Sequence, residues 1–255
     1  MSFPTLLAPA GITGDELRVE GEAYRHLFRA RRLAAGDRIR VVDGQGRARW
    51  AEVARIDRST AVLALGEPAP ANEPAVRLDL LVPTLRPERA SWMVEKVTEL
   101  GVRAIRFLHT ERAPRHFGEG TLDRLRRVAA AALEQSHGAC LPEITGPHEW
   151  RDLAALTGGA GARWVLDPEA EAGASDRSDR SDESVGLSVR SVESVGSVRA
   201  PAAALLIGPE GGWSPREQAE LRAAGWRGVG LGPRVLRTET AAVVGAAAVL
   251  LRGPN

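Results

Sequence analysis

The alternation of hydrophobic and polar positions over the first 72 residues predicts a small β-rich domain. Residues 37–44 alternate in this way and end in an Asp-Gly turn, and two further strands are expected over residues 47–56 and 61–65. Short strands separated by glycines are typical of a small barrel. Three prolines within residues 68–74 then indicate a linker between domains.

From residue 76 onwards, apolar runs of strand length alternate with segments of helical periodicity. Strands are predicted over residues 78–82, 105–108, 164–166, 204–207 and 228–231, and helices over residues 88–100, from residue 121, and over residues 241–251. The last helix is apolar on every face, which predicts that it is buried inside the domain or against a partner chain. Such alternation favours an α/β domain over residues 75–255, with a parallel sheet covered on both faces.

Residues 168–200 interrupt this pattern with near-repeats rich in Ser, Asp, Glu and Gly. Such a composition buries too little apolar area to offset the entropy of ordering. We therefore expect a disordered surface insertion, and the alternative is a regulatory or partner-binding segment.

Composition narrows the class of protein. The 255 residues are 44% hydrophobic and 26% charged, which excludes a wholly disordered chain. The single cysteine, Cys140, excludes an internal disulfide, and the five histidines show no metal-binding spacing, so no metal is expected. The chain has no apolar run of transmembrane length and no recognisable secretory signal, which favours a cytoplasmic protein.

The net charge of +1 conceals an uneven distribution of charge. Residues 25–49 contain eight arginines against two aspartates, a local balance of +6. Arginine suits bidentate phosphate contacts and stacking on bases, so this segment is a candidate RNA-binding surface. The alternative is a solvated, highly charged face of the barrel.

Two neighbouring loops carry the candidate chemistry. Residues 207–213 read Ile-Gly-Pro-Glu-Gly-Gly-Trp, and Ser214 and Glu217 then form a capping box at a helix start. One strand later, residues 231–241 read Leu-Gly-Pro-Arg-Val-Leu-Arg-Thr-Glu-Thr-Ala and lead into the last helix. Because ligands bind beyond the carboxyl ends of the strands in open α/β sheets, we predict that both loops line one site.

These two loops resemble the signatures of the bacterial 16S ribosomal RNA (uracil-1498-N3) methyltransferases. Residues 96–102 (Lys-Val-Thr-Glu-Leu-Gly-Val) and 134–136 (Glu-Gln-Ser) resemble two further motifs of that family. An arginine usually follows Glu-Gln-Ser in the family, whereas His137 and Gly138 follow here. The resemblance covers nearly the whole chain, and His26-Leu27 to Arg32-Leu33 with Gly36-Asp37 resemble the family's N-terminal RNA-binding barrel.

The resemblance implies a PUA-like barrel over residues 1–72 and a knotted (SPOUT) methyltransferase domain over residues 75–255 that uses S-adenosylmethionine and forms a homodimer. The substrate that it implies is a uridine in the 16S ribosomal RNA of the small subunit. The implied donor pocket comprises Leu166, Asp167, Ile207, Gly208, Pro209, Glu210, Gly211, Gly212, Leu231, Gly232, Val235, Leu236, Arg237 and Thr238. The implied RNA contacts are Arg25, Arg29, Arg31, Arg32, Arg38 and Arg40.

Methylation at N3 of uridine requires removal of a proton, because the protonated nitrogen is a poor nucleophile. Arg237 is expected to stabilise the anion spread over the two carbonyl oxygens, since its guanidinium stays protonated. Either Glu239 or Glu210 is the candidate base. Two other functions stay open: a ribose 2′-O-methyltransferase of the same superfamily, and a non-catalytic RNA-binding or ribosome-assembly protein.

Overall fold

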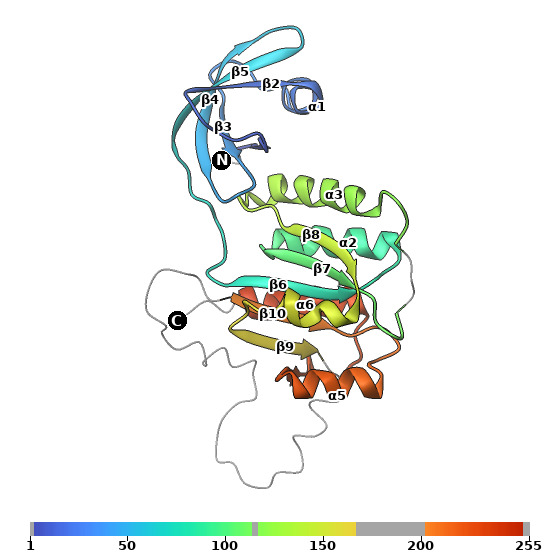
Figure 1. Ribbon diagram of the computed structural model, residues 1–255. Coiled ribbons are helices and arrows are strands. Elements are labelled where there is room, and N and C mark those ends of the chain that lie inside the picture. Colours follow the sequence, from blue (N-terminus) through green and yellow to red (C-terminus); the bar gives the residue numbers. More distant parts are fainter. Residues whose placement is uncertain (1–2, 114–116, 167–201, 252–255) are drawn as a thin grey trace. The chain divides into compact units, whose positions relative to one another are not determined.

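The computed structural model describes residues 3–113, 117–166 and 202–251 (Figure 1). Asp167 and the expected disordered insertion at residues 168–200 lie outside these ranges. The chain forms two compact units: unit 1 comprises residues 1–73 and 129–141, and unit 2 comprises residues 74–128 and 142–255.

Unit 1 is built on a five-stranded sheet with the order β1-β3-β4-β5-β2. The strands are β1 (Thr5–Leu7), β2 (Glu16–Glu20), β3 (Arg38–Val42), β4 (Ala48–Ile56) and β5 (Thr60–Pro68). β1 runs parallel to β3, and the other neighbours are antiparallel. The three predicted strands correspond to β3, β4 and β5. A short helix α1 (Gly21–Tyr24) and a π-helical segment (Arg25–Ala30) follow β2.

The core of unit 1 follows from the alternation of side chains along its strands. Ile39 and Val41 of β3, Val53 of β4 and Leu63 of β5 are almost completely buried. Tyr24 and Phe28, from α1 and the π-helical segment, are buried in the same cluster. The sheet therefore buries one side of each strand against these aromatic rings.

Unit 2 contains a six-stranded sheet with the order β11-β9-β10-β6-β7-β8. Its strands are β6 (Arg77–Pro83), β7 (Ala104–Leu108), β8 (Glu143–His148), β9 (Ala162–Leu166), β10 (Ala202–Ile207) and β11 (Arg227–Val229). All neighbouring pairs are parallel. The carboxyl ends of β6, β7, β9 and β10 consequently lie along one edge of the sheet.

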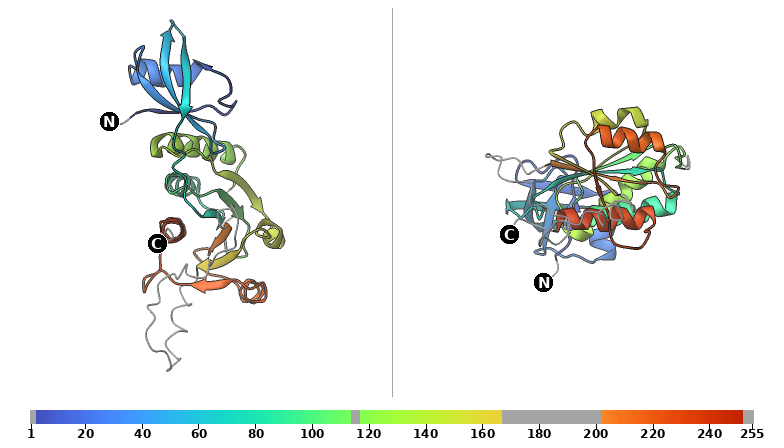
Figure 2. Two further views of the ribbon diagram at one scale, coloured as in Figure 1. Left: turned by 90° about the vertical axis from the view of Figure 1, so that its left-hand side faces the viewer. Right: turned by 90° about the horizontal axis from the view of Figure 1, so that it is seen from below.

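Helices cover both faces of this sheet (Figure 2). The helices in this part of the chain are α2 (Pro87–Glu99), α3 (Thr121–Ser136), whose residues 129–136 belong to unit 1, α4 (Leu153–Leu156), α5 (Pro215–Ala223) and α6 (Thr238–Leu250), with a 3-10 turn at Trp150–Asp152. α6 packs against α2, β6 and β10, whereas α4 and α5 lie on the opposite face, where Leu153 and Leu221 join the core. Gly245 permits the close approach of α6, since a Cβ there would lie 2.9 Å from the Leu205 side chain.

The predicted fold class is confirmed: a small β domain is followed by an α/β domain with a parallel sheet. Among the described helices, none has the length and hydrophobicity needed to traverse a lipid bilayer.

Candidate functional site

The glycine turn leaves the carboxyl end of β10 and leads directly into α5, as predicted. Ser214 occupies the N-cap, and its hydroxyl accepts a hydrogen bond from the Glu217 amide at 3.2 Å. Glu217 returns the bond by accepting from the Ser214 amide at 2.8 Å, which completes the predicted capping box. Gly212 has φ +69°, a conformation that strains residues with a side chain.

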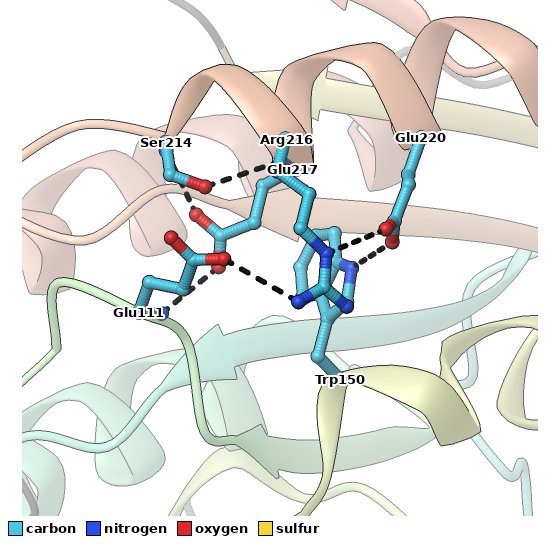
Figure 3. A network of polar contacts seen from close by, with 6 residues as sticks. All are labelled: Glu111, Trp150, Ser214, Arg216, Glu217 and Glu220. Atoms are coloured by element: carbon cyan, nitrogen blue, oxygen red, sulfur yellow. Dashed lines mark hydrogen bonds and ion pairs between the residues drawn. The ribbon is translucent and has the colours of Figure 1, made fainter.

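A polar network connects α5 to the loops after β7 and β8, at the same edge of the sheet (Figure 3). The second oxygen of Glu217, a residue that is 1% exposed, accepts from the Glu111 amide at 3.0 Å. Arg216 pairs with Glu220 at 2.9 Å, and this hydrogen bond lowers the pKa of Glu220. The Trp150 indole donates to Glu220 at 2.6 Å. The loops after β7 and β8 are thereby joined to the helix that begins at the glycine turn.

The second predicted loop meets the first, as the sequence indicates. Arg237 is the N-cap residue of α6, and the Thr238 hydroxyl donates to the Gly208 carbonyl oxygen at 3.2 Å. Thr238 thus joins the loop before α6 to the glycine turn instead of capping its own helix. The Arg237 side chain is exposed.

Arg89, in the first turn of α2, contacts both candidate bases. Its Nη1 donates to Oε1 of Glu210, and its Nε lies 3.7 Å from Oε1 of Glu239. Glu239 is only 7% exposed, and its Oε2 has no hydrogen-bond partner among the described residues. Glu210 is exposed. A cation therefore lies between two carboxylates that differ sharply in their access to solvent.

Arg112 reaches the glycine turn from the loop after β7. Its Nη1 donates to the Gly211 carbonyl oxygen at 2.9 Å, and a Cβ on Gly211 would lie 3.2 Å from the Arg112 Cβ. Neither Arg89 nor Arg112 is among the predicted site residues. Their positions just beyond the carboxyl ends of β6 and β7 are the signal that could have identified them.

The other residues that are predicted to bind the methyl donor differ in their exposure to solvent. Leu166, Ile207 and Pro209 are buried, and Ile207 is only 1% exposed. Gly208, Leu231, Gly232 and Leu236 are half-buried, and Val235 is 83% exposed.

Lys96 forms ion pairs with its helical neighbours Glu95 and Glu99, at 2.7 and 2.8 Å. These contacts indicate a structural role for Lys96. Among the described residues, no group of three or more His, Cys, Asp or Glu side chains could hold a metal ion.

Five of the six predicted RNA-binding arginines lie on the surface of unit 1. Their side chains are exposed in Arg25, Arg29, Arg31, Arg32 and Arg38. The Arg38 guanidinium stacks 4.2 Å from the centre of the Trp50 ring, and Arg29 lies over the Tyr24 ring at 5.8 Å. The arrangement provides both charge and planar groups on one domain.

The prediction for Arg40 is wrong. Its side chain is fully buried, and its guanidinium donates to the carbonyl oxygens of Pro70, Ala71 and Gly138. Burial lowers the pKa of Arg40. The outward side of β3 is covered at this position by segments that return from elsewhere in the chain, so Arg40 crosslinks unit 1 and is not available to RNA.

Two known families match parts of this chain. The family described as an RNA methyltransferase domain matches residues 72–250, and the one described as an RNA methyltransferase PUA domain matches residues 19–65. The first match includes both loops of the candidate site.

Relatives cover nearly all of the chain. A ribosomal RNA small subunit methyltransferase E from Synechocystis is 28% identical over 249 residues, which is 98% of this chain and 77% of the relative. The Mycobacterium bovis protein of the same name is 29% identical over 248 residues, which is 93% of this chain and 87% of the relative.

Solved structures agree with these relatives. A probable rRNA methyltransferase from Porphyromonas gingivalis superposes with a TM-score of 0.76 at 28% identity, covering 97% of each chain. A ribosomal RNA small subunit methyltransferase E from Neisseria gonorrhoeae, bound to S-adenosyl methionine, shares the fold with a TM-score of 0.77 at 23% identity, covering 99% of this chain and 98% of that one. With a family match over most of its length and two loops joined as the motifs predict, the chain belongs to the RNA methyltransferase family.

Proposed function

We propose that this protein transfers a methyl group from S-adenosylmethionine to N3 of a uridine in the 16S ribosomal RNA of the small subunit. The observation that carries the proposal is the joining of the two signature loops by the Thr238–Gly208 hydrogen bond, beside an arginine and two carboxylates. Relatives named ribosomal RNA small subunit methyltransferase E support the substrate class.

The residues present fit a bound methyl donor. The indole Nε1 of Trp213 is buried without a hydrogen-bond partner among the described residues. Unpaired buried polar atoms are uncommon in folded proteins and are expected to find a ligand or water. The donor supplies a methyl group on a positively charged sulfonium, and the glycine turn and the loop before α6 would hold it through backbone amides and carbonyls.

Arg237 and one carboxylate are proposed to act on the uracil ring. The exposed Arg237 guanidinium can donate to a carbonyl oxygen of the anion that forms when N3 loses its proton. Glu239 and Glu210 are the two proposed proton acceptors, since both lie on the joined loops. This assignment predicts that Arg237→Ala slows turnover even when the donor saturates the enzyme.

The exposed arginines of unit 1 are proposed to dock the RNA. Arg25, Arg29, Arg31, Arg32 and Arg38 present charge that phosphate groups would neutralise, with release of counterions. The affinity for RNA is therefore expected to fall steeply with increasing salt, and an affinity independent of salt would contradict the proposal.

A second copy of the chain is proposed to cover the apolar surface of α2 and α6. Trp92 on α2 is 45% exposed and Val244 on α6 is 42% exposed, and these two helices pack against each other. Apolar side chains on adjacent helices favour a homodimer through unit 2.

Methyl incorporation tests the proposed function. Small subunits from a strain that lacks this protein are incubated with the purified chain and a donor carrying a labelled methyl group, and calorimetry measures donor binding in parallel. Donor binding together with label in the 16S RNA is the expected result. If neither occurs, the result contradicts the proposed function and favours the non-catalytic RNA-binding alternative.

A further inference from the structure

Arg89 is the described side chain that contacts both carboxylates of the two signature loops. It enters the site from α2, an element that belongs to neither loop. Its Nη1 contacts Glu210 of the glycine turn, and its Nε lies 3.7 Å from Glu239 of α6. A single guanidinium can do this because its donors form a planar fork, which a lysine ammonium cannot reproduce.

We propose that Arg89 is a positioning residue that gives the two carboxylates different tasks. It holds Glu239 so that Oε2 accepts the N3 proton, and it engages Glu210 at the rim of the glycine turn. This inference rests on the proposed methyl transfer and goes beyond it, because it selects one of two candidate bases and names the group that orients it.

The difference between the two carboxylates supports the selection of Glu239. The side chain of Glu210 is 58% exposed and is paired directly with Arg89. Water therefore screens its charge, and Arg89 already takes up one of its oxygens. Glu239 is 7% exposed, and the oxygen that faces Arg89 is beyond hydrogen-bond distance. Its other oxygen is buried without a partner among the described residues. Glu239 therefore retains an acceptor in a water-poor position.

Two neighbouring features compensate a negative charge on the Glu239 carboxylate. An isolated buried charge is costly unless it is compensated. Glu239 lies in the first turn of α6, where the helix dipole favours an anion, and Arg89 supplies a nearby positive charge. Removing Arg89 leaves only the helix terminus to stabilise and orient this group.

The proton transfer balances without another reactant. The N3–H bond breaks, its electron pair stays on nitrogen, and the proton forms a bond to Oε2 of Glu239. The carboxylate becomes a neutral carboxylic acid, which returns its proton to water after the product leaves. Arg89 keeps its own protons throughout.

Single-turnover kinetics with saturating donor test the inference. Glu239→Gln should slow methyl transfer by about 100-fold or more, the range for loss of a general base. Arg89→Met should slow it by about 10- to 100-fold through misplacement of Glu239. Arg89→Lys should recover only part of the rate, and the exposed Arg124→Met on α3 serves as the matched control.

The double variant separates positioning from general destabilisation. If Arg89 acts through Glu239, adding Arg89→Met to Glu239→Gln slows the reaction little further, whereas adding it to Glu210→Gln still slows the reaction strongly. Thermal unfolding and donor affinity are measured on each variant so that loss of fold or of binding is recognised.

Two results would overturn the inference. One is an Arg89→Met variant with the wild-type rate, and the other is an Arg89→Met effect of equal size with and without Glu239. If the wild-type chain incorporates no methyl group at all, the proposed function fails, and that outcome is distinct because it does not depend on any variant.

Discussion

The burial of Arg40 cannot be predicted from the sequence around it. Alternation along β3 places Arg38 and Arg40 on the same side of the strand, opposite the core residue Ile39. Arg38 stays on the surface, but the linker and residue 138 cover Arg40. Contacts so distant in sequence are invisible to local patterning. The candidate surface of arginines could be predicted, but its one buried member could not.

Replacing Arg40 should destabilise unit 1. Arg40→Met leaves the carbonyl oxygens of Pro70, Ala71 and Gly138 without their donor, and each such loss costs about 1–3 kcal/mol. We expect the free energy of unfolding in urea to fall by about 3 kcal/mol or more. The exposed Arg25→Met is the control and should lower RNA affinity without changing stability. Equal stability of the two variants would contradict the structural role of Arg40.

His137 makes the stability of unit 1 depend on pH. Burial, followed by the charges of Arg40 and Arg31, lowers the pKa of His137 below its ordinary value of 6.5. The native state therefore resists protonation that the unfolded chain accepts, so stability is lost as pH falls from 6.5 towards the lower folded-state pKa.

His137→Asn should flatten this dependence of stability on pH. Asparagine tolerates the positive φ of +58° at this position and does not titrate. Urea unfolding about one pH unit above and below 6.5 measures the difference, with the exposed His26→Asn as control. A pH dependence as steep as that of the wild type would show that His137 is not its source.

At the scale of elements, Glu217 connects a helix start to a neighbouring loop. The capping box could be predicted because both of its members lie within four residues of sequence. The bond from Glu111 could not, since it joins the ends of two different strands. The same limit explains why β1, β2 and β8 were missed: β1 has only three residues and is defined by its pairing with β3.

Glu217→Ala should lower the affinity for the methyl donor and destabilise α5. The change leaves the Ser214 and Glu111 amides unpaired, which costs about 2 kcal/mol of stability, and frees the loop that carries Arg112. Calorimetry should then show weaker binding of S-adenosylmethionine. Arg222→Ala, an exposed change on the same helix, is the matched control. An unchanged affinity for S-adenosylmethionine in Glu217→Ala would show that this network does not support the donor site.

At the scale of the whole molecule, a net charge of +1 is a poor guide to partners. Exposed arginines gather at positions 25, 29, 31, 32 and 38 of unit 1, whereas other arginines of both units pair with carboxylates, as at Arg47 and Arg89. Composition suggested neither pattern, but the density of arginine along residues 25–49 predicted the first.

The apolar surface of α2 and α6 gives a prediction about assembly. Replacing Trp92 and Val244 together by aspartate should convert a homodimer into monomers in analytical ultracentrifugation, because charge is excluded from such an interface. Arg124→Asp on α3 is the control and should sediment like the wild type. A wild-type chain that sediments as a monomer at every concentration would contradict the proposed dimer.

The identity of the methylated nucleoside tests the central claim most directly. Ribosomal RNA from small subunits treated with the chain and S-adenosylmethionine is digested to nucleosides and analysed by mass spectrometry. We predict 3-methyluridine in the 16S RNA, formed by the wild type and strongly reduced with Arg237→Ala. The appearance of 2′-O-methylated nucleosides instead, or of no methylated product, would contradict methylation at N3 of uridine.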